Sequence, residues 1–345
     1  MRSKFCKSLL GCLIVSIALS LASVAATERV VAIGDVHGDL DAFVGILQRA
    51  QLIDPSRRWS GGRAVLVQTG DFLDRGSKAR EVMDLLMSLQ REAQRQGGRV
   101  VVLMGNHEAM NIFGDLRYVS NDDYASFADD RGNGRKGKTD TTKPSGFFER
   151  CEALGPDGKY GKWLRSLPAI ARIDDSIFLH GGIISDLAMR SIDQLNEGIA
   201  SEIKAFDMYK EFLVDKKIAQ SCSSLDEITA GAKTALEKAK GKDAEVLKTF
   251  LEYGRWLSIN ENGPLWFRGY AQWSDAEGAP QIEQLAKTFG VGRFVVGHTP
   301  QTGGQIVPRF NGKVYLIDTG MLSTYFKGGR ASALNIQDGK ISFIY

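Results

Sequence analysis

Side chains that can bind metal ions recur in five short segments, each of which contains glycine. Residues 34–39 read GDVHGD, 70–76 GDFLDRG, 105–108 GNHE, 180–182 HGG and 297–299 GHT. All four histidines of the chain lie in these segments. Carboxylate, imidazole and amide-oxygen ligands together suit borderline or hard cations such as Mn, Fe or Zn rather than metals that prefer thiolates. The recurrence of one context predicts a shared metal site.

Apolar runs precede the first three segments and predict the elements that position them. They indicate buried strands at 30–33, 64–67 and 100–104. Amphipathic patterns between these runs predict helices at 39–51 and 77–96. This β-α-β-α-β order is typical of a parallel sheet covered by helices.

The spacing of these segments places them at one edge of that sheet. The chain advances 36 residues from Asp35 to Asp71 and 35 residues from Asp71 to Asn106. Each interval is about the length of a βαβ unit, so each crossover returns the chain to the carboxyl edge, where ligands bind. A carboxylate midway in the set, such as Asp71, can bridge two ions. Two ions about 3.5–4 Å apart would activate a bridging hydroxide for in-line displacement at phosphorus.

The rest of the chain alternates between insertions and further strands. Strand patterns occur at 169–180, 293–297, 313–318, 331–336 and 340–345. Between these strand patterns the regular alternation of strands and helices is lost, or the chain is mainly helical. We therefore predict one catalytic domain over 27–345, with mainly helical insertions at about 111–165 and 186–262.

Composition excludes several protein classes and reveals a targeting segment. The 345 residues are 43% hydrophobic and 25% charged, which argues against disorder, collagen and multi-span membrane proteins. Residues 1–26 have a basic start, an apolar stretch and small residues at the end, the three parts of a signal peptide. The net charge of +3 lies in this segment, so the remaining chain gives no support for nucleic-acid binding. We expect a periplasmic or secreted protein without stable membrane association after signal cleavage; an uncleaved anchor is the alternative.

Two cysteines remain outside the predicted signal peptide. Export would place Cys151 and Cys222, which are 71 positions apart, in a compartment that permits disulfides. A single stabilising bridge and two unpaired buried thiols are both open, because pairing cannot be read from sequence.

Two further patterns have competing interpretations. Residues 132–139 read GNGRKGKT and fit the nucleotide-binding P-loop pattern, but the strand and helix that this loop requires are absent from the pattern around them. We interpret the segment as a solvated loop, with closure over a phosphorylated substrate as a lesser option. Aromatic residues also crowd around Arg268, namely Tyr253, Trp256, Trp266, Phe267, Tyr270 and Trp273. They either pack in a core or wall a pocket for an aryl phosphate such as phosphotyrosine.

The five segments, in this order and at this spacing, resemble the phosphoprotein-phosphatase branch of the metallophosphoesterases. The longer runs MGNHEAMNIFGDLRYVS and GPLWFRG are similar, more narrowly, to the Shewanella-like bacterial protein phosphatases. The resemblance spans residues 34–299. It implies an α/β fold, in which a metallophosphoesterase-type β-sandwich is flanked by helices, and a calcineurin-like domain over 27–345.

The resemblance also implies a role for each residue of the site. One metal ion would be held by Asp35, His37 and Asp71. The other would be held by Asp71, Asn106, His180 and His298. His107 would protonate the leaving oxygen while Asp74 orients its imidazole. Arg75, Arg268 and Asn106 would bind the phosphate, since a guanidinium fork matches phosphate oxygens.

The chain departs from the family pattern at two places. Many metallophosphoesterases have a second histidine two residues after the one in GHT, where this chain has Pro300. One ion should therefore be more open to water or substrate. The SAPNYC loop of eukaryotic serine/threonine phosphatases is missing, so their substrate preference cannot be carried over.

These observations predict a metal-dependent phosphatase that hydrolyses phosphate monoesters by attack of a metal-bridging hydroxide. It would use two divalent or mixed-valence ions of Mn, Fe or Zn. The favoured substrate is a phosphotyrosine protein or peptide. The alternatives are a small-molecule phosphomonoesterase, a dinucleoside-polyphosphate hydrolase and, more remotely, a non-enzymatic metal- or phosphoprotein-binding module. The presence of His107, Asp74 and Arg75 counts against the last, because binding alone needs no general acid.

Overall fold

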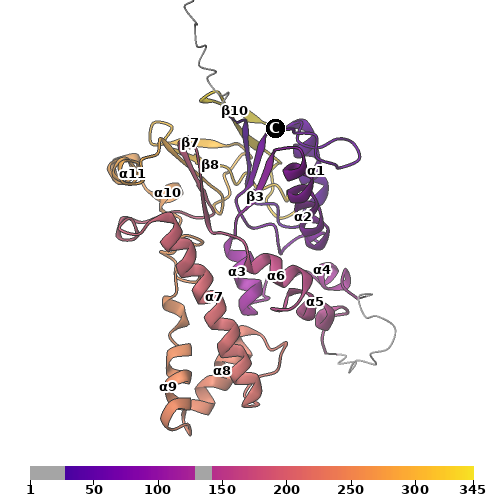
Figure 1. Cartoon of the computed structure of the whole chain (residues 1–345), viewed down its shortest axis with the longest axis vertical. Helices are drawn as coiled ribbons and strands as arrows, with labels where there is room; N and C mark the ends of the chain where they lie inside the picture. The colour runs from indigo at the N-terminus through magenta and orange to yellow at the C-terminus, as the bar shows by residue number, and fades with distance from the viewer. Residues whose placement is uncertain (1–27, 129–141) are drawn as a thin grey trace, which may run out of the picture.

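Two five-stranded sheets form the centre of the computed structural model, which describes residues 28–128 and 142–345 (Figure 1). Their strand orders are β10-β9-β1-β2-β3 and β4-β5-β6-β8-β7. Side chains from both sheets form one apolar cluster, in which Val67 and Leu334 of the first sheet lie with Phe178 and Val295 of the second. The predicted β-sandwich is therefore confirmed.

The first sheet contains the predicted β-α-β-α-β unit. Its parallel strands are β1 (Val30–Ile33), β2 (Val65–Gln68) and β3 (Arg99–Val102). The helices α1 (Leu40–Arg49) and α2 (Ala79–Arg95) connect them. Each predicted helix agrees with the observed one to within two residues at either end.

The alternation of side chains along β1 explains how this sheet is buried on both faces. Val30 and Ala32 belong to the cluster between the two sheets, whereas Val31 and Ile33 pack with residues of the helices. This period of two is that of a β-strand. In Figure 1, α1 and α2 lie on the outer side of the strands, as parallel strands with two apolar faces require.

Strands from the second half of the chain complete both sheets. β9 (Ala333–Gln337) pairs antiparallel with β1, and β10 (Lys340–Ile344) pairs antiparallel with β9. The second sheet consists of β4 (Ile170–Ile173), β5 (Ser176–Leu179), β6 (Arg293–Val296), β7 (Val307–Arg309) and β8 (Val314–Leu316). β5, β6 and β8 are parallel, so their carboxyl ends also meet at one edge. The helices α10 (Gly269–Gln272) and α11 (Asp275–Phe289) lie beside this sheet (Figure 1).

The second sheet differs in two details from the sequence patterns. The pattern at 169–180 divides into β4 and β5, because the chain turns at Asp174, whose φ is +49°. β7 has no counterpart among the predicted strands. It is short and contains Pro308, and proline in a sheet is typical of an edge strand, which β7 is.

The two insertions form helices that extend beyond the sandwich. The first contains the end of α3 (Asn106–Phe113) with α4 (Asn121–Ala125), α5 (Phe147–Leu154) and α6 (Lys159–Arg165). The second contains α7 (Ile192–Asp215), α8 (Leu225–Leu236) and α9 (Gly241–Phe250). Figure 1 shows α7, α8 and α9 projecting downward from the sheets. Capping boxes that start at Ser191 and Ser224 define where α7 and α8 begin.

Cys151 and Cys222 form a disulfide, which decides between the two alternatives left by the sequence. Cys151 lies in α5, and Cys222 lies in the connection between α7 and α8. The bond therefore joins the two insertions. Because 71 positions separate the cysteines, it also closes a long loop of the unfolded chain.

We expect the Cys151→Ser, Cys222→Ser double variant to lose about 2–4 kcal/mol of unfolding free energy, because the open chain gains loop entropy when it unfolds. Urea denaturation measures this loss. The wild-type protein unfolded in reductant is the matched control and should lose the same amount. An unchanged denaturation midpoint would show that the bond adds no stability.

Two sequence predictions lie outside the described residues. These are the signal peptide at 1–26 and the P-loop-like segment at 132–139. Within 28–128 and 142–345, no helix combines the length and apolar character needed to cross a membrane.

Candidate active site

The predicted site residues converge where strands of both sheets end. Asp35 follows β1, Asp71 follows β2 and Asn106 begins the helix after β3. His180 follows β5 and His298 follows β6. All of these side chains are buried. The carboxyl edges of the two sheets therefore supply one site, as the spacing predicted for the first of them.

Several site residues adopt a backbone conformation that is uncommon for residues other than glycine. The φ angles are positive, between 47° and 68°, at His37, Asp71, Asp74, Arg75 and His298. Such conformations cost free energy and persist only where the surrounding structure enforces them. They turn each side chain sharply from the strand end toward the site.

Two glycines allow the carboxylates to approach the neighbouring backbone. A Cβ atom on Gly105 would lie 2.3 Å from Oδ1 of Asp71, and one on Gly297 would lie 2.4 Å from Oδ1 of Asp35. The backbone N–H groups of His107 and His298 donate to the same two oxygens, at 2.9 Å and 3.0 Å. Any larger residue at these glycines would displace a carboxylate that the adjacent amide holds.

Hydrogen-bond acceptors face one another around Asp71. Nε2 of His180 lies 3.1 Å from Oδ2 of Asp71, 2.9 Å from Oδ1 of Asn106 and 3.0 Å from Nδ1 of His298. The other ring nitrogen of each imidazole contacts a backbone carbonyl. Nδ1 of His180 lies 3.0 Å from the carbonyl oxygen of Thr69, and Nε2 of His298 lies 2.8 Å from the carbonyl oxygen of Trp266. A carbonyl only accepts, so each imidazole carries its proton on that side.

Four atoms therefore lie close together without a proton on any of them. They are Nε2 of His180, Nδ1 of His298, Oδ2 of Asp71 and Oδ1 of Asn106. Burial lowers the pKa of His298 well below its ordinary value, and the charge of Arg268 lowers it further, so its imidazole is neutral. Neutral imidazole with carboxylate and amide oxygen is a ligand set for a divalent cation. The donor set therefore fits a metal ion here.

A second group of donors also lies near Oδ2 of Asp71. Nε2 of His37 lies 3.8 Å from Oδ2 of Asp35 and 3.9 Å from Oδ2 of Asp71. Nδ1 of His37 lies 2.9 Å from the carbonyl oxygen of Leu73, which leaves Nε2 as the unprotonated nitrogen. Burial lowers the pKa of His37 to about 3, which keeps this imidazole neutral. Oδ2 of Asp71 is thus near donors of both groups, as the oxygen of a bridging carboxylate would be.

His107 differs from the other histidines in its partner. Its Nδ1 lies 2.7 Å from Oδ2 of Asp74, and both side chains are buried. Burial by itself lowers the pKa of His107, but the carboxylates of Asp71 and Asp74 raise it above its ordinary value. His107 is therefore suited to hold a proton, which a general acid requires. Its Nε2 lies 3.8 Å from Oδ2 of Asp71, so the proton would face the site.

Two arginines border these groups. Nη1 of Arg75 lies 2.9 Å from Nε2 of His37, and Nη2 lies 3.3 Å from Nε2 of His107. Nε of Arg75 is buried and has no hydrogen-bond partner among the described residues, so it is available to an anion. Arg268 donates from Nη1 to the carbonyl oxygen of His298 at 2.7 Å and to Oγ1 of Thr299 at 3.1 Å. Both predicted phosphate-binding arginines thus lie at the site.

The comparison with known families identifies this arrangement. The model of the calcineurin-like phosphoesterases matches residues 28–302, which include every segment described above. The chain belongs to the calcineurin-like phosphoesterases. This family of metallophosphoesterases uses a dinuclear metal centre, and the structure places two groups of possible metal ligands around Asp71, one with His37 and His107 and the other with His180 and His298. The chain is therefore a hydrolase of phosphoesters.

Individual proteins and a solved structure that resemble this phosphoesterase give a more specific comparison. An uncharacterised protein of Schizosaccharomyces pombe is 32% identical over 314 residues, which cover 89% of this chain and 76% of that protein. Shewanella-like protein phosphatase 2 of Arabidopsis thaliana is 37% identical over 205 residues, which cover 52% of each chain. A cold-active protein-tyrosine phosphatase of a psychrophilic Shewanella species matches with a TM-score of 0.63 and 26% identity, over 92% of this chain and 77% of that one. The predicted resemblance to the Shewanella-like phosphatases is confirmed.

Glu108 has a role in the phosphoesterase site that sequence reasoning did not assign. Its Oε2 accepts from the backbone N–H groups of Asp71 at 2.7 Å and Gly105 at 2.8 Å. Its Oε1 accepts from those of Phe72 at 3.0 Å and Leu73 at 3.1 Å. The sequence contained a signal for this residue, because Glu108 directly follows the candidate site residues Asn106 and His107 in the GNHE segment. One buried side chain, that of Glu108, thus holds the loop that carries Asp71.

We expect Glu108→Gln to lower the unfolding free energy by about 3–5 kcal/mol, since an amide group would face two backbone N–H donors and charged hydrogen bonds would be lost. Differential scanning calorimetry measures this effect. Glu237→Gln is the matched control, because Glu237 is exposed at the end of α8, and it should leave the melting temperature unchanged. Equal melting temperatures for both variants would disprove this role for Glu108.

Asp318 is a second residue that the sequence interpretation omitted. It follows β8, is buried and forms a side-chain hydrogen bond with Asp35. Burial raises its pKa to about 6, although the N–H of Gly320, which donates to Oδ1 at 3.0 Å, opposes that rise. The pattern of an acid and a glycine after an apolar strand could have revealed it, as it revealed Asp35. Asp318 thus contacts and supports Asp35, which is a candidate metal ligand.

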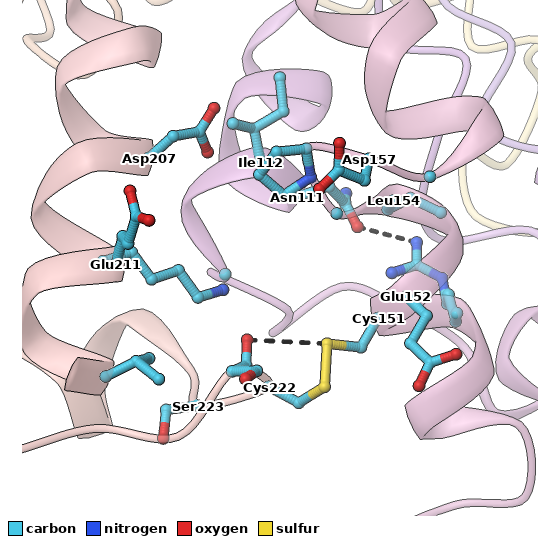
Figure 2. Close-up of a pocket in the computed structure, with 18 of the residues that line it drawn as sticks. Asn111, Ile112, Cys151, Glu152, Leu154, Asp157, Asp207, Glu211, Cys222 and Ser223 are labelled. Atoms are coloured by element: carbon cyan, nitrogen blue, oxygen red, sulfur yellow. Dashed lines mark hydrogen bonds between the residues drawn. A yellow bond between two sulfur atoms is a disulfide. The ribbon is translucent and has the colours of Figure 1, made fainter. Parts of the chain in front are cut away.

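A buried hydrogen-bond chain also supports the His107–Asp74 pair. Nδ2 of Asn111 donates to Oδ1 of Asp74 at 2.8 Å, and Oδ1 of Asn111 accepts from Nη2 of Arg150 at 2.8 Å. Arg150 in turn donates from Nε to Oδ2 of Asp123 at 2.8 Å. Arg150 lines a cavity of about 810 Å³ between α7 and the α5–α6 region. Figure 2 shows Asn111 and the disulfide between Cys151 and Cys222 at this cavity. The insertion therefore contacts the site through Asn111.

The aromatic residues near Arg268 in sequence mostly pack against one another. Phe267, Tyr270 and Trp273 form ring contacts with centroids 5.2–5.9 Å apart. Tyr253 contacts Phe250, at 5.6 Å. Of the six, Trp266 is the one with a ring contact to a site residue, at 6.2 Å from His298. The core-packing alternative therefore describes this cluster.

Proposed function

We propose that this phosphoesterase is a protein phosphatase that hydrolyses phosphate monoesters, with phosphotyrosine as the favoured substrate. The observation that carries the proposal is the position of the His107–Asp74 pair in the donor cluster around Asp71, where the carboxylates of Asp71 and Asp74 favour a proton on His107. A binding protein would need the donor groups but not the acid. The similarity to a protein-tyrosine phosphatase of known structure supports the choice of substrate.

In the proposed hydrolysis, different residues of this chain bind the phosphate and supply the proton. Asp71 and the candidate ligands around it would hold two cations, which would supply positive charge to ionise the attacking water and to offset the charge of the phosphoryl group. Arg75 and Arg268 orient the phosphate. A new bond from the water oxygen to phosphorus forms while the bond to the ester oxygen breaks. His107 gives its proton to the departing oxygen, and the proton from the water leaves to solvent.

The sequence and the disulfide also support proposals on the metal and the compartment. We infer that the native ions are Mn, Fe or Zn, because the donors are carboxylate, amide oxygen and imidazole without thiolate. We infer export to the periplasm or to the medium from the signal-peptide pattern at 1–26. The disulfide between Cys151 and Cys222 supports this inference, since such bonds persist in oxidising compartments.

Substrate assays on the Mn-loaded protein test the function. The panel consists of para-nitrophenyl phosphate, matched phosphotyrosine and phosphoserine peptides, and diadenosine tetraphosphate. We expect release of phosphate from the phosphotyrosine peptide at the highest kcat/KM and no release after complete chelation. Faster cleavage of diadenosine tetraphosphate would instead support a dinucleoside-polyphosphate hydrolase. Activity that survives removal of all metal would disprove the metal-dependent mechanism.

A further inference from the structure

Three aromatic rings surround the guanidinium of Arg75. Its Cζ lies 4.5 Å from the ring centroid of Tyr325, 5.5 Å from that of Phe326 and 5.7 Å from that of Tyr118. All three distances are within the range of cation–π contacts. Tyr118 and Tyr325 are 207 positions apart, so two separate segments converge on this arginine. We call Tyr118, Tyr325 and Phe326 the aromatic bracket.

The two tyrosines of the aromatic bracket are exposed although the site beneath them is buried. Tyr118 is 39% exposed and Tyr325 is 53% exposed, and among the described residues the other aromatic side chain with such exposure is Phe343 on β10. The remaining Phe, Tyr and Trp side chains of the described residues are buried or half-buried. Exposed aromatic surface beside a polar site is typical of a place where a ligand binds.

Backbone contacts hold the aromatic bracket in place. The carbonyl oxygen of Tyr118 accepts from the N–H of Arg75 at 2.8 Å, so this ring and the arginine are positioned together. The loop with Tyr325 is closed at its base, where the N–H of Arg330 donates to the carbonyl oxygen of Thr319 at 3.1 Å. The hydroxyl of Thr319 donates back to the carbonyl oxygen of Arg330 at 2.7 Å.

The aromatic bracket lies at the end of the site where the leaving group departs. The ring of Tyr118 is 5.1 Å from the imidazole of His107, with an angle of 45° between the ring planes. An acid that protonates the ester oxygen must lie within hydrogen-bond reach of that oxygen. The part of the substrate attached to this oxygen therefore begins beside Tyr118.

We propose that the aromatic bracket is a subsite for the ring of an aryl phosphate, and that it selects phosphotyrosine over phosphoserine and phosphothreonine. In phosphotyrosine the ring is bonded directly to the ester oxygen, so it lies next to Tyr118 and Tyr325 when Arg75 binds the phosphate. In phosphoserine this space receives one carbon and then polar backbone, which gains less from aromatic contact. The inference rests on the proposed phosphatase function and assigns its specificity to named residues.

Binding of unreactive phosphonates to the full chain tests the aromatic bracket without catalysis. We expect isothermal titration calorimetry on the Mn-loaded protein to give tighter binding of benzylphosphonate than of propylphosphonate. Tyr118→Leu and Tyr325→Leu should each lower this ratio about fivefold, and the double variant about 20-fold, since each lost ring contact is worth roughly 0.5–1.5 kcal/mol. Tyr118→Phe and Tyr325→Phe keep the ring and should keep the ratio. Phe343→Leu is the matched control for an exposed aromatic residue.

The same variants are then assayed on matched phosphotyrosine and phosphoserine peptides, where the ratio of kcat/KM values should fall in parallel. Equal binding of the two phosphonates by the wild-type protein would overturn the inference. An equal loss for both phosphonates in the Leu variants would overturn it too, because the rings would then only position Arg75. If phosphonate selectivity depends on the aromatic bracket but neither peptide is hydrolysed, the subsite is supported and the proposed protein-phosphatase function fails.

Discussion

His107→Asn should lower kcat for phenyl phosphate by about two to four orders of magnitude, the usual contribution of a positioned general acid. Asparagine cannot give a proton to the departing oxygen, while the surrounding donors are unchanged. The defect should be smaller for para-nitrophenyl phosphate, because its leaving group departs readily without a proton. Steady-state kinetics on the two esters measures the difference.

Metal analysis separates this role from a structural one. We expect the His107→Asn variant to bind the same amount of Mn as the wild-type protein, because the imidazole contacts Asp74 rather than a backbone carbonyl. Asp74→Asn should show the same selective loss on phenyl phosphate, since it would remove the carboxylate that favours the protonated imidazole. Loss of Mn together with an equal defect on both esters would make His107 a ligand and not the acid.

Asp71→Asn should remove bound metal and lower kcat/KM by at least about a thousandfold, the largest effect that we expect from a single substitution. Asp71 is common to both donor groups, and its carboxylate is held beside His180 at 3.1 Å. A neutral amide would offset none of the charge of two cations and would bridge them poorly. Elemental analysis after dialysis and para-nitrophenyl phosphate turnover measure the two losses.

Asp39→Asn is the matched control for this substitution, because Asp39 belongs to the same GDVHGD motif but caps α1 by accepting from the N–H of Ala42. It should keep its metal and its turnover. Chelation of the wild-type protein should reproduce the Asp71→Asn defect and lower the melting temperature, since a ligand at 100 times its Kd contributes about 2.7 kcal/mol. Retention of both metal ions by Asp71→Asn would disprove the bridging role.

Much of the site could be predicted because its signals are local. Asp35, Asp71 and Asn106 each follow an apolar strand, and the length of a βαβ unit dictates that the chain returns to the same edge. The same rule would have found Asp318, which follows β8 in the same way. Glu108 was visible in its motif, but its function depends on four backbone N–H groups that only the folded loop gathers.

Contacts between distant segments could not be predicted in this way. The chain has two cysteines outside the signal-peptide pattern, yet whether Cys151 and Cys222 meet depends on how α5 packs against the connection between α7 and α8. The aromatic residues around Arg268 in sequence pack in or against the core, whereas Tyr118 and Tyr325, which no local pattern connects, both lie against Arg75.

The sequence by itself predicted the fold class and the candidate ligand and acid residues, because strand period, crossover length and the motifs shared with a known family are features of short spans of chain. The tertiary structure decided which imidazole nitrogens carry protons, by placing His180 against Thr69 and His298 against Trp266. It also brought Cys151 and Cys222 together in a disulfide and placed the rings of the aromatic bracket around Arg75. These features depend on side-chain packing between segments far apart in the chain, and that packing follows from the whole core rather than from any one motif.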